Sequence, residues 1–167
     1  MENTSNLNDL DLDNKQGASA PLPSASAEDY INDPILEEQW AMKAFQHAET
    51  YFNLLRSLDP TSLRLTPHDD QIYTRFRQVF PDLKIDHLDE DHIKSVEGKQ
   101  QWRSFCEEFR ELIDDYSYGT LVRTDAKGEY TSENTILVVR IQFYAIEIAR
   151  NREGSNESIR RDFGSKK

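Results

Sequence analysis

Residues 130–154 read YTSENTILVVRIQFYAIEIARNREG, and this stretch decides the fold because it is apolar along most of its length. Residues 134–139 are rich in β-branched side chains and predict a strand. Residues 141–152 place apolar side chains on both sides of a helical projection, so this helix should have neighbours on either side. Gly154 can adopt the left-handed conformation that ends many helices. We therefore expect this segment to form the centre of the core.

The segments before this stretch supply its partners. Residues 118–124 predict a second strand, and a turn at residues 125–128 leads from it toward the strand at residues 134–139, so that the two strands form a hairpin. A brief capped turn is expected at residues 89–93. Three amphipathic helices are predicted upstream: one from Pro34, capped by Asp33, to about Asp59; one from the cap Thr66 to Pro81; and one marked by apolar residues from Trp102 to Tyr116.

The predicted fold is mainly α (α+β): a compact four-helix domain with one small antiparallel β-hairpin. Residues 1–28 are polar and lack aromatic side chains, which predicts a disordered tail. Residues 155–167 are again polar, with four basic and two acidic side chains, and are expected to form a short disordered basic tail. A single globular domain is thus expected at residues 29–154, since 167 residues allow one core with tails.

Composition narrows the classes of partner. The net charge of −11 disfavours a phosphate-binding surface, so we expect no direct contact with nucleic acid. No segment has the roughly 20 apolar residues that a membrane span needs, and the start lacks the pattern of a secretory signal. The single cysteine, Cys106, excludes an internal disulfide and fits the reducing cytosol or nucleus. We expect a cytoplasmic or nuclear monomer that contacts no membrane.

Candidate catalytic and cofactor sites are weak. The six glycines are scattered over tails, turns and a helix end, so no nucleotide or dinucleotide loop is indicated and no cofactor is expected. The run from Asp86 to His92 contains metal-ligand residue types, but a solvated turn with a helix cap explains it better. His47 falls on an apolar row and is expected in the core, and Cys106 falls on another, where a thiol acts as a small hydrophobe. We predict no catalytic and no metal-binding residue.

Two groups of residues are candidates for binding a protein partner. Arg140, Gln142 and the charged helix end Arg150, Asn151, Arg152 and Glu153 could form a polar recognition patch beside the hairpin, although a helix end in solvent would look the same. Ile159 and Phe163 lie four residues apart in the basic tail, a spacing typical of peptides that fold into a groove on a partner.

The sequence resembles the eukaryotic polysaccharide biosynthesis domain-containing protein family over residues 29–154. The most specific match is the block at residues 130–154. The other matching pieces are NDP at 32–34, WAMKAFQHAETYF from Trp40, DDQIYTRFRQVF from Asp69, WRSFCEEF from Trp102 and YGTLVR from Tyr118.

The resemblance implies a non-catalytic protein-binding role. Fungal members of this family are associated with biogenesis of translation elongation factor 1-alpha, which implies a dedicated co-translational chaperone near the ribosome. The expected client is the nascent GTP-binding domain of that factor. It would contact Asp70 and Gln71 of the second predicted helix together with the hairpin and the 150–153 end.

Two alternatives stay open. The family name derives from a distant likeness to plant enzymes that methylate glucuronoxylan, which would imply an S-adenosylmethionine-dependent methyltransferase of polysaccharide biosynthesis. The absence of a glycine-rich cofactor loop argues against it. The other alternative is a structural subunit of a larger complex.

Overall fold

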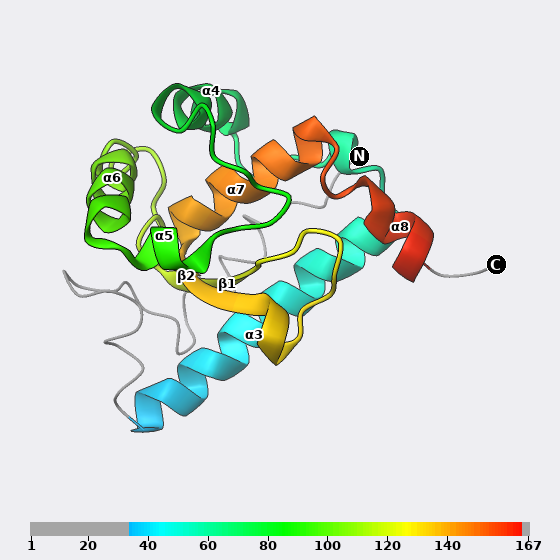
Figure 1. Ribbon diagram of the computed structural model, residues 1–167. Helices are drawn as coiled ribbons and strands as arrows, with labels where there is room; N and C mark the ends of the chain where they lie inside the picture. The colour runs from blue at the N-terminus through cyan, green and yellow to red at the C-terminus, as the bar shows by residue number, and fades with distance from the viewer. Residues whose placement is uncertain (1–33, 165–167) are drawn as a thin grey trace.

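The computed structural model describes residues 34–164, which form a mainly helical domain with one antiparallel strand pair (Figure 1). The predicted tail at residues 1–28 and the expected cap Asp33 lie outside this described part. In chain order the elements are α3 (Pro34–Ser57), η1 (Pro60–Ser62), α4 (Asp69–Val79), α5 (Glu90–Lys94), α6 (Val96–Glu107), β1 (Gly119–Arg123), η2 (Ser132–Asn134), β2 (Thr135–Val139), α7 (Arg140–Glu153) and α8 (Glu157–Phe163). The predicted fold class is confirmed, and the helices outnumber the four expected.

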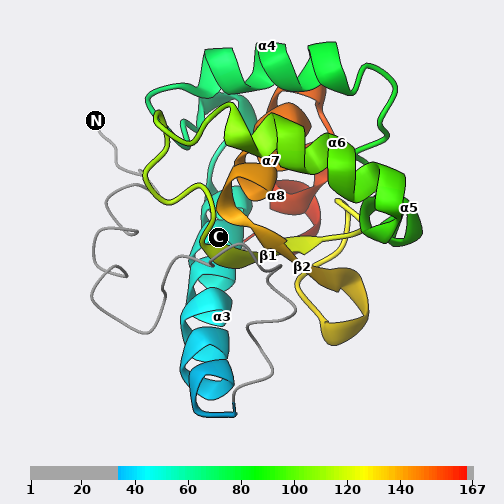
Figure 2. The same cartoon turned by 90° about the vertical axis from the view of Figure 1, so that its left-hand side faces the viewer.

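Helix α7 lies at the centre of the molecule, as its two-sided apolar pattern predicts. Eleven of its fourteen residues are buried. It lies between α4 and α3 in both ribbon views (Figures 1 and 2). Gly154 ends the helix with φ of 93°, the left-handed conformation that glycine adopts without strain. At the other end, the side-chain oxygen of Gln142 accepts a hydrogen bond from the Val139 amide at 2.9 Å.

The strands β1 and β2 pair directly, with Leu121 opposite Leu137. Helix α3 crosses β1 closely at Gly119, where an added Cβ would lie 2.5 Å from the indole ring of Trp40. Glycine therefore permits this approach of helix and strand. His47 of α3 is buried, and its Nδ1 lies 2.9 Å from the Thr120 hydroxyl of β1. The prediction that His47 belongs to the core is confirmed.

An aromatic cluster fills the core between α4 and α6. The rings of Phe80 and Trp102 stack with centroids 4.4 Å apart, and Phe76 and Phe105 pack around them. The prediction that this third helix continues to Tyr116 is wrong, because α6 ends at Glu107. Phe109 and Ile113 keep their helical spacing and are buried, but the backbone around them forms successive turns.

The segment after Gly154 also differs from its prediction. Residues 157–163 form helix α8, which packs against α3. Ile159 is fully buried, and the Phe163 ring contacts Phe52 with centroids 5.6 Å apart. The Nε of Arg56 donates to the Phe163 carbonyl at 2.8 Å. The apolar contacts of Ile159 and Phe163 and the hydrogen bond from Arg56 thus stabilise a helix in a segment whose composition predicts disorder.

Candidate functional site

The structure removes several predicted binding residues from the surface. Arg140, Arg150 and Asn151 are buried, with exposed fractions of 2%, 0% and 3%. Arg140 forms an ion pair with Asp115 at 2.9 Å. Ile159 is part of the core, so the pair of Ile159 and Phe163 does not form a free peptide motif. The buried side chains Arg140, Arg150, Asn151 and Ile159 support the fold, so they are not available for direct contact with a partner.

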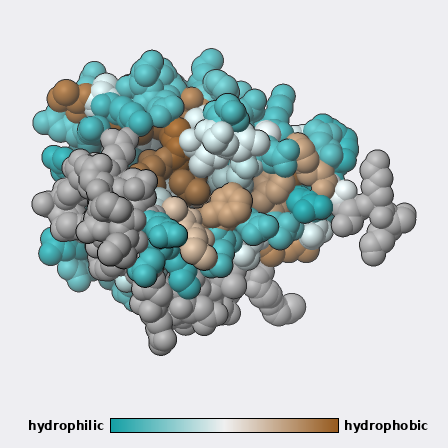
Figure 3. All heavy atoms as spheres, turned by 90° about the horizontal axis from the view of Figure 1, so that it is seen from below, coloured by the Kyte–Doolittle hydropathy of each residue, from teal (hydrophilic) through white to brown (hydrophobic). Residues whose placement is uncertain are grey.

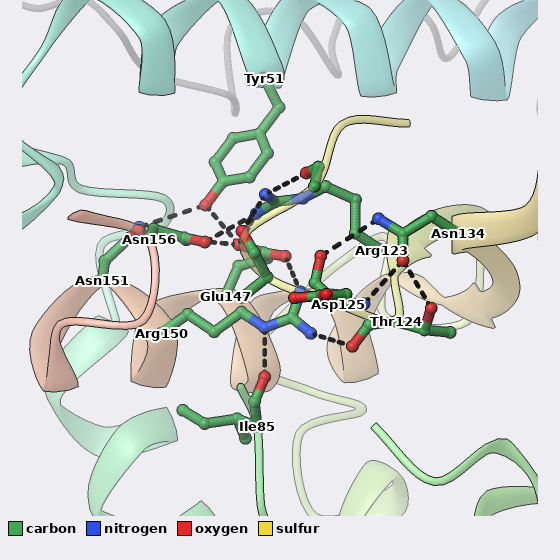
Figure 4. Close-up of polar contacts among 12 residues, drawn as sticks. Tyr51, Ile85, Arg123, Thr124, Asp125, Asn134, Glu147, Arg150, Asn151 and Asn156 are labelled. Carbon is green, nitrogen blue, oxygen red and sulfur yellow. Dashed lines mark hydrogen bonds and ion pairs between the residues drawn. The ribbon is translucent and has the colours of Figure 1, made fainter. Parts of the chain in front are cut away.

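Arg150 belongs to a buried polar network centred on Glu147, shown in Figure 4. One carboxylate oxygen of Glu147 accepts from Nη1 of Arg150 at 2.9 Å. The other accepts from the Tyr51 hydroxyl and the Asn156 amide, both at 2.8 Å, and lies 3.4 Å from Nη2 of Arg123. The network therefore joins α3, β1, α7 and the turn before α8.

Backbone carbonyls accept further hydrogen bonds from the two guanidinium groups of the network. Arg150 donates to the carbonyls of Ile85 at 2.7 Å and Thr124 at 3.1 Å. Arg123 donates to the carbonyl of Ala126 at 2.6 Å and to the side-chain oxygen of Asn156 at 2.7 Å. These partners hold the loop before α5 and the loop after β1 against α7. The role of this network is to stabilise the fold, because its hydrogen-bond donors and its central carboxylate bind one another.

The charges of the network set the protonation of its central groups. Burial would raise the pKa of the Glu147 carboxyl, but Arg123 and Arg150 together hold that pKa below its ordinary value. Burial also raises the pKa of the Tyr51 hydroxyl, and the adjacent Glu147 carboxylate adds to this shift. Glu147 is thus ionised and Tyr51 is a neutral donor at neutral pH.

Glu147, Arg123, Tyr51 and Asn156 were not predicted as a group from the sequence. One signal was present: Glu147 lies between Ile146 and Ile148 in a helix predicted to be covered on both sides. A charged residue in such a position needs a buried partner of opposite charge. The partners come from distant segments, so periodicity could not identify them.

Four predicted residues lie together on an exposed surface where α4 meets the end of α7. We call Asp70, Gln71, Arg152 and Glu153 the α4–α7 surface; all four are exposed. Arg152 pairs with Asp70 at 2.7 Å, and its guanidinium lies 5.3 Å from the Tyr73 ring centroid. The second predicted helix and the 150–153 end thus meet at these positions, and their role in binding a partner stays a prediction. Gln142 is half-buried and caps α7 instead.

The α4–α7 surface is ordered by contacts between the two helices. The Glu153 carboxylate accepts from the Tyr73 hydroxyl at 2.7 Å and from two nitrogens of Arg77 at 2.8 and 2.9 Å. These bonds hold the pKa of Glu153 below its ordinary value, the bond to Arg77 being the largest cause. A hollow of about 160 Å³ adjoins the surface, lined in part by Asp70, Arg152 and Arg64. The charged groups are thus presented in fixed positions beside a small concavity.

Other residues that could carry chemistry have ordinary roles in the fold. Burial raises the pKa of the Cys106 thiol to about 12, so the thiol is protonated at neutral pH. Asp89 caps α5 by accepting from the His92 amide, as its predicted role requires. Between residues 34 and 164, no three His, Cys, Asp or Glu side chains lie close enough to hold a metal ion. No helix in this range is both long and apolar enough to cross a membrane.

The comparison with protein families identifies the domain. The family model described as PBDC1 protein matches residues 36–161, which span α3 to α8 almost completely. The chain belongs to this family. The match extends into α8, in agreement with the folded state of that helix, and it confirms the resemblance to polysaccharide biosynthesis domain-containing proteins.

Curated relatives and a solved structure agree with this assignment. Protein PBDC1 of Mus musculus is 53% identical over 132 residues, covering 79% of this chain and 67% of the mouse protein. The Homo sapiens protein is 54% identical over 136 residues, covering 81% of this chain and 58% of the human one. The Saccharomyces cerevisiae homolog is 44% identical over 142 residues, covering 83% of this chain and 97% of the homolog.

A solution NMR structure of a Saccharomyces cerevisiae protein has the same fold. Its TM-score is 0.73 at 43% sequence identity, and the match covers 84% of this chain and 99% of the yeast chain. The chain spans little more than half of the human relative and nearly all of the yeast one. The domain described above is therefore the part that these proteins share.

Proposed function

We propose that the protein is a non-catalytic binding domain that serves as a dedicated co-translational chaperone of nascent translation elongation factor 1-alpha. In this role the α4–α7 surface holds the GTP-binding domain of the client. The client follows from the family resemblance. The observation that carries the binding surface is the exposed, ordered group of Asp70, Gln71, Arg152 and Glu153 at the junction of two helices.

The distribution of charge supports a binding role for this surface. The buried charged side chains of α7 bind carboxylates, guanidinium groups or backbone carbonyls within the core, so their contribution is to stability. Asp70 is different, since 94% of its side chain is exposed and its ion pair with Arg152 lies at the surface. A surface ion pair contributes about 0–1 kcal/mol to folding, so Asp70 is largely free to serve recognition.

A pull-down of stalled ribosomes tests the client and the surface separately. Ribosomes stalled after the GTP-binding domain of elongation factor 1-alpha should bind the tagged protein in preference to ribosomes carrying an unrelated nascent GTP-binding domain. Asp70→Arg should weaken this binding at least about fivefold, because it reverses a charge at the contact. Glu111→Arg reverses an exposed charge outside the surface and should leave binding unchanged.

The two possible failures are distinguishable. Equal binding to both nascent chains would reject the client. Preferential binding that Asp70→Arg leaves intact would keep the client and reject the α4–α7 surface. Circular dichroism of both variants checks that the fold is unchanged.

A further inference from the structure

A groove with apolar walls lies on the opposite side of α7 from the α4–α7 surface, along helix α3. Its volume is about 380 Å³, and its apolar walls come from Phe45 and Phe52 of α3, Tyr130 of the loop between β1 and β2, and Phe163 of α8. Figure 3, which views the molecule from below, shows apolar residues gathered in a band across this side. Three separate parts of the chain therefore converge on one concave surface.

The apolar stripe that leads into the groove is exposed. Met42 and Phe45 expose 60% and 54% of their surface and lie on the same face of α3 as Phe52. The described part of the chain leaves few large apolar side chains as open to solvent as these two. Neighbouring exposed apolar residues beside a groove are typical of a protein-binding site rather than of scattered surface residues.

Two of the apolar walls of the groove, Phe52 and Tyr130, contact the buried network. The guanidinium carbon of Arg123 lies 5.6 Å from the ring centroid of Phe52 and 5.7 Å from that of Tyr130. Arg123 itself is fully buried and bound to Asn156 at 2.7 Å. Phe163 is held by its ring contact with Phe52 and by the bond from Arg56 to its carbonyl. A partner would meet preformed walls, which lowers the entropic cost of binding.

The charges at the groove indicate the chemistry of its occupant. Glu49 and Glu129 line the groove and are exposed, and neither forms an ion pair with any residue from 34 to 164. Among the described residues that line the groove, the one basic side chain is Arg56, which donates to the Phe163 carbonyl and to Asn53. The carboxylates of Glu49 and Glu129 therefore give the solvent-facing side of the groove a negative charge, and they lie between its apolar walls.

We call this concavity, lined by Phe45, Phe52, Tyr130 and Phe163, the α3–α8 groove. From its arrangement we propose that the α3–α8 groove binds a basic amphipathic segment of another protein. Large apolar side chains of that segment would fill the space between Phe45, Phe52 and Phe163, and its Lys or Arg residues would pair with Glu49 and Glu129. A second copy of this chain fits poorly because each copy carries a net charge of −11. The chain's own residues 1–28 fit poorly too, since they contain five acids and one base.

Fluorescence anisotropy with the whole 167-residue chain tests the groove. The probe is a fluorescein-labelled peptide of about 18 residues, roughly five helical turns, with Leu and Phe on one face and Lys on the other. A twin peptide carries Glu in place of Lys. The Lys peptide should bind saturably, and the Glu peptide at least about tenfold more weakly. Phe45→Ala should weaken binding of the Lys peptide about tenfold, as expected for an aromatic anchor at the centre of an interface.

Matched variants separate groove binding from attraction to an acidic protein. Val96→Ala removes an exposed apolar side chain on α6 and should leave the affinity unchanged. Glu49→Lys combined with Glu129→Lys should weaken binding and reduce its dependence on salt. Equal affinities for the wild type and Phe45→Ala, or for the two peptides, would overturn the proposal.

Photo-crosslinking identifies the occupant directly. With Phe45→p-benzoylphenylalanine in the full chain, irradiation should link position 45 to the Lys peptide. Links to residues 1–33 or to a second copy, formed in place of the peptide link, would show that the chain covers its own groove and would contradict the proposal.

Discussion

Glu147 lies at the centre of the buried polar network. Its carboxylate accepts bonds from Arg150, Tyr51 and Asn156 and lies 3.4 Å from Arg123, and all five residues are fully buried. Burying such charges is unfavourable unless every group has a partner. Because one acid faces two guanidinium groups, backbone carbonyls accept several of the remaining hydrogen bonds. The network therefore behaves as one unit, in which the loss of one member leaves the others unsatisfied.

Glu147→Gln should lower the free energy of unfolding by about 3–5 kcal/mol, because it leaves two buried guanidinium groups without a counter-charge. Urea denaturation at pH 7 measures this change. Glu157→Gln makes the same substitution at an exposed position in the first turn of α8 and should cost less than about 1 kcal/mol. Equal losses in the two variants would show that the buried carboxylate is not the central partner.

The pH dependence of stability follows from the same residue. The pKa of Glu147 is lower in the folded protein than in the unfolded chain, so the folded state binds its proton less readily. Its contribution to stability is complete above the unfolded value of about 4.3 and is lost as the pH falls through the folded pKa. Relative to the wild type, Glu147→Gln should therefore lose less stability on acidification. Parallel curves of unfolding free energy against pH would contradict this prediction.

At the scale of elements, periodicity and caps predicted most of the fold. The strands at 119–123 and 135–139 and helix α7 agree with their predicted bounds to within one residue. The prediction that α6 continues to Tyr116 was wrong because the spacing of apolar residues indicates which residues are buried, not which backbone they adopt. Phe109 and Ile113 are buried, but they lie in turns rather than in a helix. α8 was missed because its stability comes from contacts with α3, which local composition does not encode.

Helix α8 should be an integral part of the domain. Ile159→Ala should lower the free energy of unfolding by about 2–5 kcal/mol, the usual range for emptying a fully buried aliphatic site. Arg161→Ala changes an exposed residue of the same helix and should alter stability by less than about 0.5 kcal/mol. Differential scanning calorimetry compares the two. Similar midpoints for both variants would indicate that α8 is detached in solution.

For the whole molecule, the sequence identified the family, and four of the ten residues predicted to bind a partner lie on the exposed α4–α7 surface. Asp70, Gln71, Arg152 and Glu153 are exposed as expected, whereas Arg150 is buried only two residues away from Arg152. Two residues on a helix differ by about 200° in direction, so neighbouring arginines at one helix end can have opposite environments. The α3–α8 groove could not be predicted, because Phe45, Tyr130 and Phe163 are brought together by tertiary packing.

The net charge of −11 should make the stability of the whole domain depend on salt. Exposed ion pairs such as Arg75 with Glu108 contribute little each, and the excess of surface acids repels itself, so screening should favour the folded state. Raising NaCl from about 10 to about 200 mM at pH 7 should increase the unfolding midpoint by roughly 2–4 °C, equivalent to about 1 kcal/mol for a domain of this size. The increase should vanish near pH 4.8, the isoelectric point calculated from the sequence. The buried ion pairs of Glu147 are shielded from dissolved ions and should not contribute to this salt dependence. A decrease in the midpoint at pH 7 would show instead that attractive surface ion pairs outweigh the repulsion.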